Sequence, residues 1–244
     1  MSILAKKRVL LTGGGSGIGL ATARLLLQHD ARVAITGRSL SRLRQAADSL
    51  EAGDRLMIQA CDLTQANEVE KLVDNVTAHL GGIDILINNA GLNIKERLFS
   101  QLTPESWQKL IAGNLDGAFH AMHAVLPQMR KRKDGLIINI NSISGLRANP
   151  LGGVGYIAAK FGLRGLAMGV AAEEKPNGIR VTSIYPGEVN TPILEVRPEP
   201  VSEERKQAML QPEDVAGAVL FVATLPAHVA IPEMIITPAN ATYI

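Results

Sequence analysis

Residues 12–19 read T-G-G-G-S-G-I-G and stand between an apolar run, 7–12, and a segment of helical composition, 18–29. Glycines at 13, 17 and 19 permit a tight turn and let the backbone approach a bound group closely. The helix that follows presents free N–H groups and the positive end of its dipole, which suit a pyrophosphate. Because the turn lies between a strand and a helix, the stretch predicts a dinucleotide-binding site.

The rest of the chain continues this alternation of apolar runs and helical segments. Near-continuous apolar strands between helices need cover on both faces, so the pattern predicts an α/β fold. We expect a doubly wound, mostly parallel seven-stranded sheet with helices on both faces, a Rossmann fold. The predicted strands are 7–12, 32–37, 55–60, 83–88, 136–141, 179–185 and 234–237, and the helices 18–29, 40–50, 66–80, 106–132, 156–175, 203–210 and 212–225. One domain over 1–244 is expected, with a substrate loop at about 188–210.

Composition excludes several classes of protein. The chain has 244 residues, 46% of them hydrophobic and 20% charged, which is enough to bury a sizeable core. A net charge of +2 and 3% aromatic residues argue against nucleic-acid binding. The longest stretch without charged residues, 215–232, is interrupted by Pro226, so no membrane partner is expected. The single cysteine, Cys61, forms no intrachain disulfide, which favours a reducing, cytoplasmic compartment.

Further motifs follow the glycine turn in a set order. They are Asn88-Asn89-Ala90-Gly91, Asn114, Ser142, Tyr156-x-x-x-Lys160 and Pro186-Gly187. With the T-G-x-x-x-G-x-G turn, they resemble the short-chain dehydrogenase/reductase family over essentially the whole chain. The resemblance implies an NAD(P)-dependent oxidoreductase that acts on CH–OH groups and interconverts a small secondary alcohol and its ketone by hydride transfer. It implies cofactor contacts from Gly13, Ser16, Gly17, Ile18, Gly19, Arg38, Asp62, Leu63, Asn89, Ala90, Gly91, Tyr156, Lys160, Pro186, Gly187, Val189 and Thr191.

The end of the second predicted strand bears on the choice of cofactor. An acidic residue there would bind a ribose 2′-hydroxyl, but the chain has Gly37 followed by Arg38. A guanidinium can pair with a 2′-phosphate, so NADP(H) is the predicted cofactor and NAD(H) remains possible. The alternative is that Arg38 is a solvated residue at a helix start. Asp62 resembles the family's adenine-contacting aspartate, and it could also cap the next helix.

Tyr156 and Lys160 are four residues apart on a predicted helix and therefore share a face. The ammonium favours the phenolate and the oxidised nicotinamide adds further positive charge, so we expect the two together to lower the tyrosine pKa from about 10. Tyr156 would then exchange a proton with the substrate oxygen, and Ser142 would donate a hydrogen bond to the same oxygen. The resemblance implies that Asn114 holds a water linking Lys160 to solvent.

The serine position leaves an alternative open. The family usually places this hydroxyl one residue nearer the tyrosine, which here is Ile143. Ser142 and Ser144 flank that position. Ser142 is preferred because the family's hydroxyl precedes a glycine by two or three residues, and Gly145 satisfies that spacing.

Three side chains at helical spacing, Asp116, His120 and His123, could suggest a metal site. No further cluster of cysteine or histidine supports it, so we expect no metal and a packing or interface role for this helix.

The substrate end of the site is expected at 92–97, 144–154 and 188–197. These segments carry Lys95, Arg97, Arg147 and Arg197, any of which could hold a substrate carboxylate or form an internal ion pair. Residues 224–238 resemble family members that oxidise 3-hydroxy acids, including serine-like amino acids. Alternatives are a ketoacyl or hydroxysteroid-type reductase and a non-catalytic nicotinamide-nucleotide sensor. Members of the family are usually oligomers, so a homodimer or homotetramer is expected.

Overall fold

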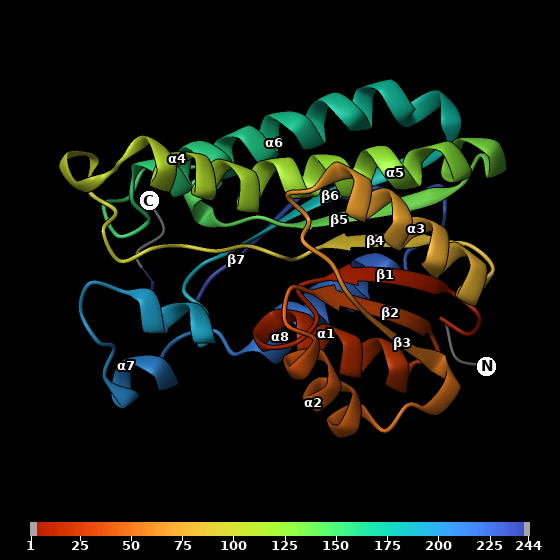
Figure 1. Cartoon of the computed structure of the whole chain (residues 1–244), viewed down its shortest axis with the longest axis horizontal. Helices are drawn as coiled ribbons and strands as arrows, with labels where there is room; N and C mark the ends of the chain where they lie inside the picture. Colours follow the sequence, from red (N-terminus) through yellow and green to blue (C-terminus); the bar gives the residue numbers. More distant parts are fainter. Residues whose placement is uncertain (1–3, 242–244) are drawn as a thin grey trace.

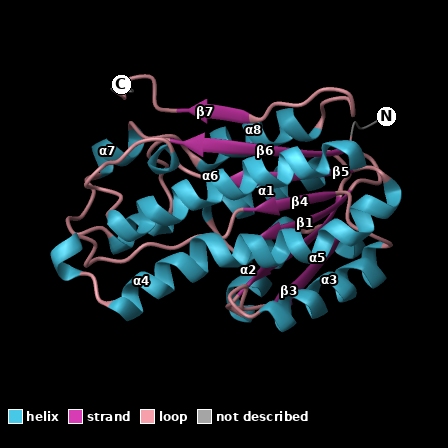
Figure 2. Cartoon of the chain, turned by 90° about the horizontal axis from the view of Figure 1, so that it is seen from above, coloured by secondary structure: helices cyan, strands magenta, loops and turns pink. Residues whose placement is uncertain are grey.

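The computed structural model describes residues 4–241, and it arranges them in three layers (Figures 1 and 2). The middle layer is a seven-stranded sheet in the order β3-β2-β1-β4-β5-β6-β7, with every neighbouring pair parallel. The predicted doubly wound Rossmann fold is therefore confirmed. The strands are β1 (Arg8–Thr12), β2 (Arg32–Gly37), β3 (Leu56–Ala60), β4 (Ile85–Asn88), β5 (Gly135–Ile140), β6 (Ile179–Pro186) and β7 (Glu233–Ile236).

Helices cover the two faces of the sheet and enclose two hydrophobic cores. In Figure 1, α1, α2 and α8 lie below the sheet, and α3, α5 and α6 lie above it. Successive side chains of β1 point to opposite faces of the sheet. Val9 and Leu11 therefore belong to the core under α1, α2 and α8, and Leu10 belongs to the core under α3, α5 and α6. The helices are α1 (Gly17–Gln28), α2 (Leu40–Leu50), α3 (Ala66–Leu80), α4 (Pro104–Ile111), α5 (Gly117–Arg132), α6 (Val154–Glu174), α7 (Glu203–Gln207) and α8 (Pro212–Ala223).

The long helix predicted over 106–132 is wrong as a single element. A π-helical turn, Ala112–Asp116, separates α4 from α5. At this turn a Cβ on Gly113 would lie only 2.5 Å from the Leu92 side chain, so the loop after β4 packs directly on the backbone. Helical periodicity alone does not reveal an extra residue in a turn, and such insertions concentrate at functional sites. The other departures from the predicted helices and strands are shifts of their ends.

The crossover between the two halves of the sheet falls between β1 and β4. Thr12, at the end of β1, joins the two strand ends with its side chain. Its Oγ1 accepts hydrogen bonds from the backbone N–H groups of Asn89, at 3.0 Å, and Ala90, at 3.1 Å. Ligands of open α/β sheets bind outside the carboxyl ends of the strands at such a crossover, so this edge is where a site is expected.

Candidate functional site

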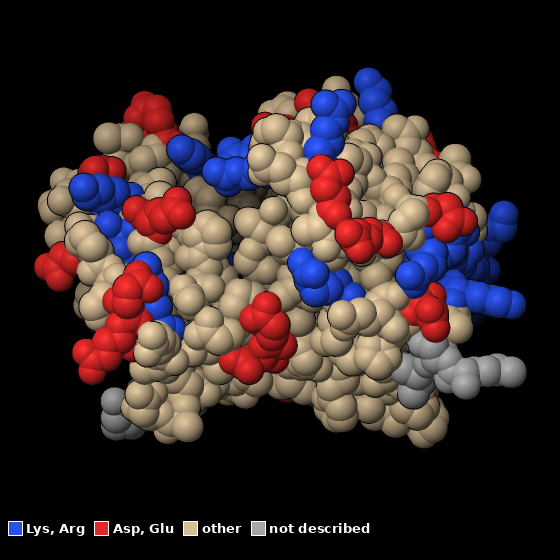
Figure 3. Space-filling view, turned by 90° about the horizontal axis from the view of Figure 1, so that it is seen from below, with Lys and Arg blue, Asp and Glu red and all other residues tan. Residues whose placement is uncertain are grey.

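A cavity of about 1290 Å³ opens at the carboxyl ends of the strands, and we call it the switch-point pocket. Figure 3 shows a hollow near the middle of one face of the molecule, with Lys and Arg side chains beside it. The predicted residues that line this pocket are Gly13, Ser16, Gly17, Ile18, Arg38, Asp62, Leu63, Asn89, Ala90, Gly91, Ser142, Tyr156, Lys160, Pro186, Gly187, Val189 and Thr191. The remaining two predicted residues, Gly19 and Asn114, lie behind its wall.

The glycine turn has the geometry of an anion cradle. Gly13 and Gly17 have φ angles of +68° and +51°, which residues with a side chain rarely adopt. Ser16 precedes α1 without capping it through its side chain, and the first turn of α1 holds no acidic residue. Free N–H groups and the helix dipole therefore favour a bound anion here, and the turn fits the pyrophosphate of a dinucleotide.

Gly19 does not line the pocket, but it allows close packing behind the glycine turn. A Cβ at this position would lie 2.2 Å from the carbonyl oxygen of Gly13 and 2.6 Å from Asn89 Nδ2. Asn89 in turn donates hydrogen bonds from Nδ2 to the carbonyls of Thr12 and Gly13, both at 3.0 Å. The absence of a side chain at Gly19 thus lets α1 approach the turn and lets Asn89 fix it.

The end of β2 carries positive charge and no carboxylate. Gly37 and the exposed Arg38 line the pocket, as does Arg42 one turn further along α2. Arg42 was not predicted from the sequence, although a second arginine in the first turn of the helix that follows Arg38 was a signal that could have found it. Two guanidinium groups on one side of the pocket suit a phosphate.

Asp62 lies in the pocket wall after β3 and does not cap α3. The N-cap of α3 is Gln65, so the capping alternative for Asp62 is wrong. The Asp62 carboxylate instead accepts hydrogen bonds from the backbone N–H of Thr64, at 3.0 Å, and from its hydroxyl, at 2.9 Å. These bonds close a local turn that places Asp62 and Leu63 at the pocket.

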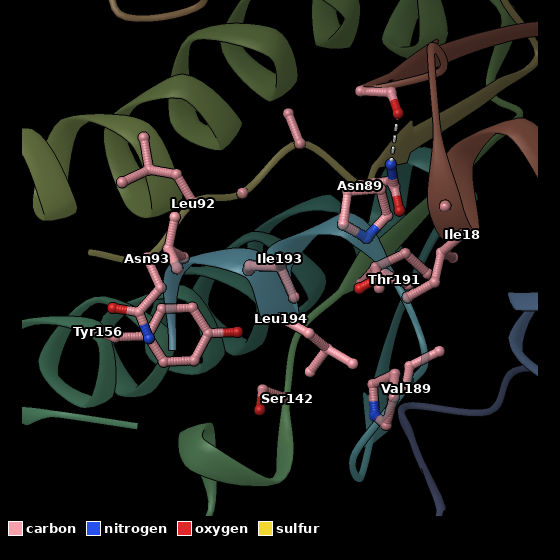
Figure 4. Close-up of a pocket in the computed structure, with 18 of the residues that line it drawn as sticks. Ile18, Asn89, Leu92, Asn93, Ser142, Tyr156, Val189, Thr191, Ile193 and Leu194 are labelled. Atoms are coloured by element: carbon pink, nitrogen blue, oxygen red, sulfur yellow. Dashed lines mark hydrogen bonds between the residues drawn. The ribbon is translucent and has the colours of Figure 1, made fainter. Parts of the chain in front are cut away.

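Tyr156, Lys160 and Ser142 also line the pocket. Figure 4 shows Tyr156 and Ser142 at its other end. Helix α6 places Tyr156 and Lys160 on one face, and Ser142 follows β5. Lys160 Nζ lies 5.6 Å from the centre of the Tyr156 ring and donates a hydrogen bond to the Ile140 carbonyl at 3.1 Å. Figure 4 shows the Tyr156 hydroxyl pointing into the pocket, on the side where Ser142 and Leu194 lie.

The two candidate serines occupy different positions. Ser142 lies close enough to Tyr156 to lower the pKa of its hydroxyl, and the Ser142 Oγ accepts a hydrogen bond from the Ser144 N–H at 3.1 Å. Ser144 is buried, and its Oγ lies against Gly152, where an added Cβ would be only 3.0 Å away. The geometry therefore favours Ser142 as the hydroxyl beside the tyrosine.

Asn114 is buried beside the catalytic end of the pocket, in the π-helical turn. Its Oδ1 accepts a hydrogen bond from the Leu92 N–H at 3.0 Å, and its Nδ2 donates to the carbonyls of Leu92, at 2.9 Å, and Leu110, at 2.8 Å. The amide thus holds the loop after β4 against α4. That it also holds a water beside Lys160 stays a prediction.

In the chain on its own, without the nicotinamide that the prediction includes, the pKa of Tyr156 is not lowered. Burial raises it, and Ser142 and the charge of Arg97 only partly oppose this rise. Burial also lowers the pKa of Lys160 to about 8, so its ammonium loses the proton more readily than a solvated lysine but is still mostly charged at pH 7. The four-residue spacing predicts that Tyr156 and Lys160 lie close together. It does not predict how far burial removes them from water, which controls both pKa values.

Within residues 4–241, no group of three or more His, Cys, Asp or Glu side chains could hold a metal ion. His120 Nδ1 lies 2.9 Å from the Leu63 carbonyl, and the rings of His120 and His123 both pack near Phe119. Over the same residues, no helix is long and apolar enough to cross a membrane.

The predicted substrate loop folds over the pocket. Its ends are joined by hydrogen bonds from Leu210 N–H to the Glu188 carbonyl, at 3.0 Å, and from Asn190 N–H to the Leu210 carbonyl, at 2.8 Å. The Glu188 carboxylate accepts hydrogen bonds from Arg197 at 2.8 Å and from Arg205 at 3.0 Å. Of the four cations considered for the substrate, Arg97 and Arg197 line the pocket, and Lys95 and Arg147 do not. Asn93 and Lys109 also line it, but Lys109 carried no signal in the sequence.

Known proteins resemble this chain in both sequence and structure. The profile of short chain dehydrogenases matches residues 7–201. An uncharacterised oxidoreductase of Staphylococcus aureus (strain MRSA252) is 35% identical over 238 residues, covering 98% of this chain and 100% of that protein. The closed form of a serine dehydrogenase complexed with NADP+ superposes with a TM-score of 0.88 at 34% identity, covering 96% of each chain. A variant of actinorhodin polyketide ketoreductase with NADPH gives a TM-score of 0.87 at 31% identity, covering 97% of this chain and 98% of that one.

A parallel sheet with a glycine turn at its crossover, and a buried lysine beside a tyrosine in the same pocket, defines an oxidoreductase of the Rossmann class. Within that class, the chain belongs to the short-chain dehydrogenase/reductase family.

Proposed function

We propose that this protein is an NADP(H)-dependent oxidoreductase that interconverts a small secondary alcohol and its ketone. The observation that carries the proposal is that one pocket joins the glycine turn to Tyr156, Ser142 and Lys160. A cofactor held by the turn would reach along the pocket to the tyrosine. When bound, the nicotinamide supplies or accepts the hydride.

The residues of the chain handle the proton and the developing charge. In reduction, Tyr156 gives its hydroxyl proton to the carbonyl oxygen as that carbon receives the hydride. Ser142 donates a hydrogen bond that stabilises negative charge on the same oxygen. Lys160 places a positive charge beside the ring, and the reverse sequence serves alcohol oxidation. The raised pKa of Tyr156 keeps the hydroxyl protonated near neutral pH, which suits a proton donor.

The preference for NADP(H) rests on Gly37, Arg38 and Arg42 at the pocket wall. Both arginines are exposed and can pair with a 2′-phosphate, and Gly37 offers no carboxylate for ribose hydroxyls. The serine dehydrogenase and polyketide ketoreductase structures described above contain NADP+ and NADPH, which supports the same choice. NAD(H) remains the weaker alternative cofactor in this proposal.

A small polar substrate fits the pocket better than a steroid or an acyl thioester. The loop over the pocket presents Glu188, Glu195, Arg197 and Arg205 to the cavity beside the apolar Ile193, Leu194 and Met209. A long apolar substrate would have to pass these four charged groups. The likeness to a polyketide ketoreductase keeps ketoacyl reduction as the second candidate. Nicotinamide-nucleotide sensing without catalysis is the third, and Tyr156 beside Ser142 argues against it, because binding alone needs no proton donor.

The test is turnover followed by nicotinamide absorbance. NADP(H) and NAD(H) are each assayed with 3-hydroxy acids, serine-like amino acids, sugar alcohols, ketones and ketoacyl thioesters, with Tyr156→Phe as the control. We expect turnover with NADP(H) that the variant abolishes, while the variant still binds NADPH by fluorescence. NADPH binding without any turnover points to the sensor, and the absence of both contradicts the proposal.

We also propose that the protein is a homodimer or homotetramer. Phe119 on α5 and Phe161 and Met168 on α6 are 47%, 42% and 58% exposed, which is unusual for side chains of this size. Light scattering at micromolar concentration tests this, and a monomer contradicts it.

A further inference from the structure

Arg97 is a buried cation in the wall of the switch-point pocket. It lies in the loop between β4 and α4, and only 5% of its surface is exposed. The backbone of Gly153, at the start of α6, lies so close that an added Cβ would be 2.5 Å from Arg97 Cβ. Burying a guanidinium is costly unless something compensates its charge.

The hydrogen bonds of Arg97 leave its charge without a partner. Nη1 donates to the Leu151 carbonyl at 2.8 Å, Nη2 donates to the Val196 carbonyl, and buried Nε has no hydrogen-bond partner. Within residues 4–241, no Asp or Glu forms an ion pair with Arg97. A guanidinium has five N–H donors, so most of this group's capacity is unused.

The neighbouring arginines show what a compensated cation looks like in the same pocket. Arg197 and Arg205 share the carboxylate of Glu188, at 2.8 Å and 3.0 Å. The proximity of Arg197 adds a second positive charge near Arg97, and burial with this repulsion lowers the pKa of Arg97. The protein therefore supplies one carboxylate for two arginines and none for the third.

We propose that Arg97 determines specificity by binding a carboxylate of the substrate, so that the enzyme acts on short hydroxy acids and their oxo acids. The inference rests on the proposed function and names the substrate class of that site. Arg97 and Tyr156 lie in one pocket, and the charge of Arg97 acts on the Tyr156 phenol. A substrate in this pocket could therefore present its carboxylate to Arg97 and its hydroxyl to Tyr156. The Nε–Nη2 edge is the side of the fork that binds a carboxylate bidentately.

A purely structural role explains less of the geometry. Arg97 does join the loop before α6, through Leu151, to the substrate loop, through Val196. Two backbone carbonyls, however, require only neutral donors, and a buried positive charge adds cost without adding a bond. Substrate binding accounts for the charge and for the position next to Tyr156, and the two loop contacts then serve to fix the guanidinium.

The test compares an acid with its neutral ester. Wild type, Arg97→Met and the matched control Arg197→Met are assayed with NADP+ on 2-hydroxybutanoate, 3-hydroxybutanoate and 4-hydroxypentanoate and on their methyl esters. We expect Arg97→Met to lower kcat/KM for the preferred acid by about 100-fold and to change that for its ester less than about threefold. Arg197→Met should leave the acid-to-ester ratio near that of wild type. Arg97→Lys should restore part of the preference, because it keeps the charge but loses the fork.

The outcomes separate this inference from the proposed function. Acid and ester activities that fall together indicate a structural role and overturn the inference. Turnover of neutral alcohols without any preference for acids also overturns it, while the oxidoreductase function stands. If none of these compounds reacts, acetoacetate is titrated calorimetrically into the NADP+ complex. Saturable binding that Arg97→Met loses and Arg197→Met keeps supports the inference, and no saturable binding to wild type contradicts it.

Discussion

Lys160 Nζ lies 5.6 Å from the centre of the Tyr156 ring, with its ammonium turned to the carbonyl of Ile140. This carbonyl, at the end of β5, supplies the only hydrogen bond of the ammonium among residues 4–241. Lys160 is 3% exposed, so the ammonium is held at the end of the sheet largely out of water. Because the ammonium is buried, the free energy of unfolding depends on whether Lys160 is protonated.

The first prediction concerns Lys160→Met and pH. Burial lowers the pKa of Lys160 from its ordinary 10.5 to about 8. Between these values the unfolded chain binds more protons than the folded one, so the free energy of unfolding of wild type should rise with pH relative to Lys160→Met. The slope is at most about 1.4 kcal/mol per pH unit, and below pH 8 the difference between the two proteins is constant.

Urea unfolding of wild type and Lys160→Met from pH 7 to 10 measures this difference. Lys131→Met, at an exposed lysine of α5, is the control and should run parallel to wild type. If the free energy of unfolding depends on pH in the same way in all three proteins, Lys160 is not desolvated, which contradicts its burial in the structure.

The second prediction separates the two serines. Ser142 lies close enough to Tyr156 to lower the pKa of its hydroxyl, whereas Ser144 Oγ lies against Gly152. Ser142→Ala should lower kcat by about 100- to 1000-fold, because it removes a donor to the reacting oxygen, with little change in NADPH affinity. Ser144→Ala should retain most of the activity. The opposite pattern in steady-state kinetics assigns the role to Ser144.

The third prediction concerns cofactor choice. Arg38→Asp places a carboxylate where the 2′-phosphate is expected, so the ratio of kcat/KM for NADPH over NADH should fall by about 10- to 100-fold. Arg42→Asp should act in the same direction. Arg44→Asp changes the same charge on the exposed side of α2, outside the pocket lining, and serves as the control. A ratio that is the same in Arg38→Asp and Arg44→Asp assigns Arg38 to the solvated helix start.

The sequence predicted the sheet and the pocket well because both rest on local patterns. Apolar runs such as 136–141 mark buried strands, and parallel order brings their carboxyl ends together. The π-helical turn around Asn114 was not predicted, because the helical segments on both sides of it keep the ordinary α-helical period. The pKa values of Tyr156 and Lys160 depend on desolvation by distant segments, which spacing does not report. Contacts with distant segments also distinguish Arg197, which pairs with Glu188, from Arg97, which pairs with no carboxylate of the described residues. The sequence alone does not report these contacts.

The fourth prediction tests the packing under the glycine turn with Gly19→Ala and Gly217→Ala. A Cβ at Gly19 would lie 2.2 Å from the Gly13 carbonyl oxygen, and backbone cannot move aside as a flexible side chain can. We expect Gly19→Ala to lose about 1–3 kcal/mol of stability and to weaken NADPH binding, because the turn must shift. Gly217, inside α8, has no atom within 4 Å of an added Cβ, so Gly217→Ala should gain about 0.5–1 kcal/mol. Thermal melts with and without NADPH measure both effects. Equal melting temperatures for the two variants contradict the close approach of α1 to Gly13.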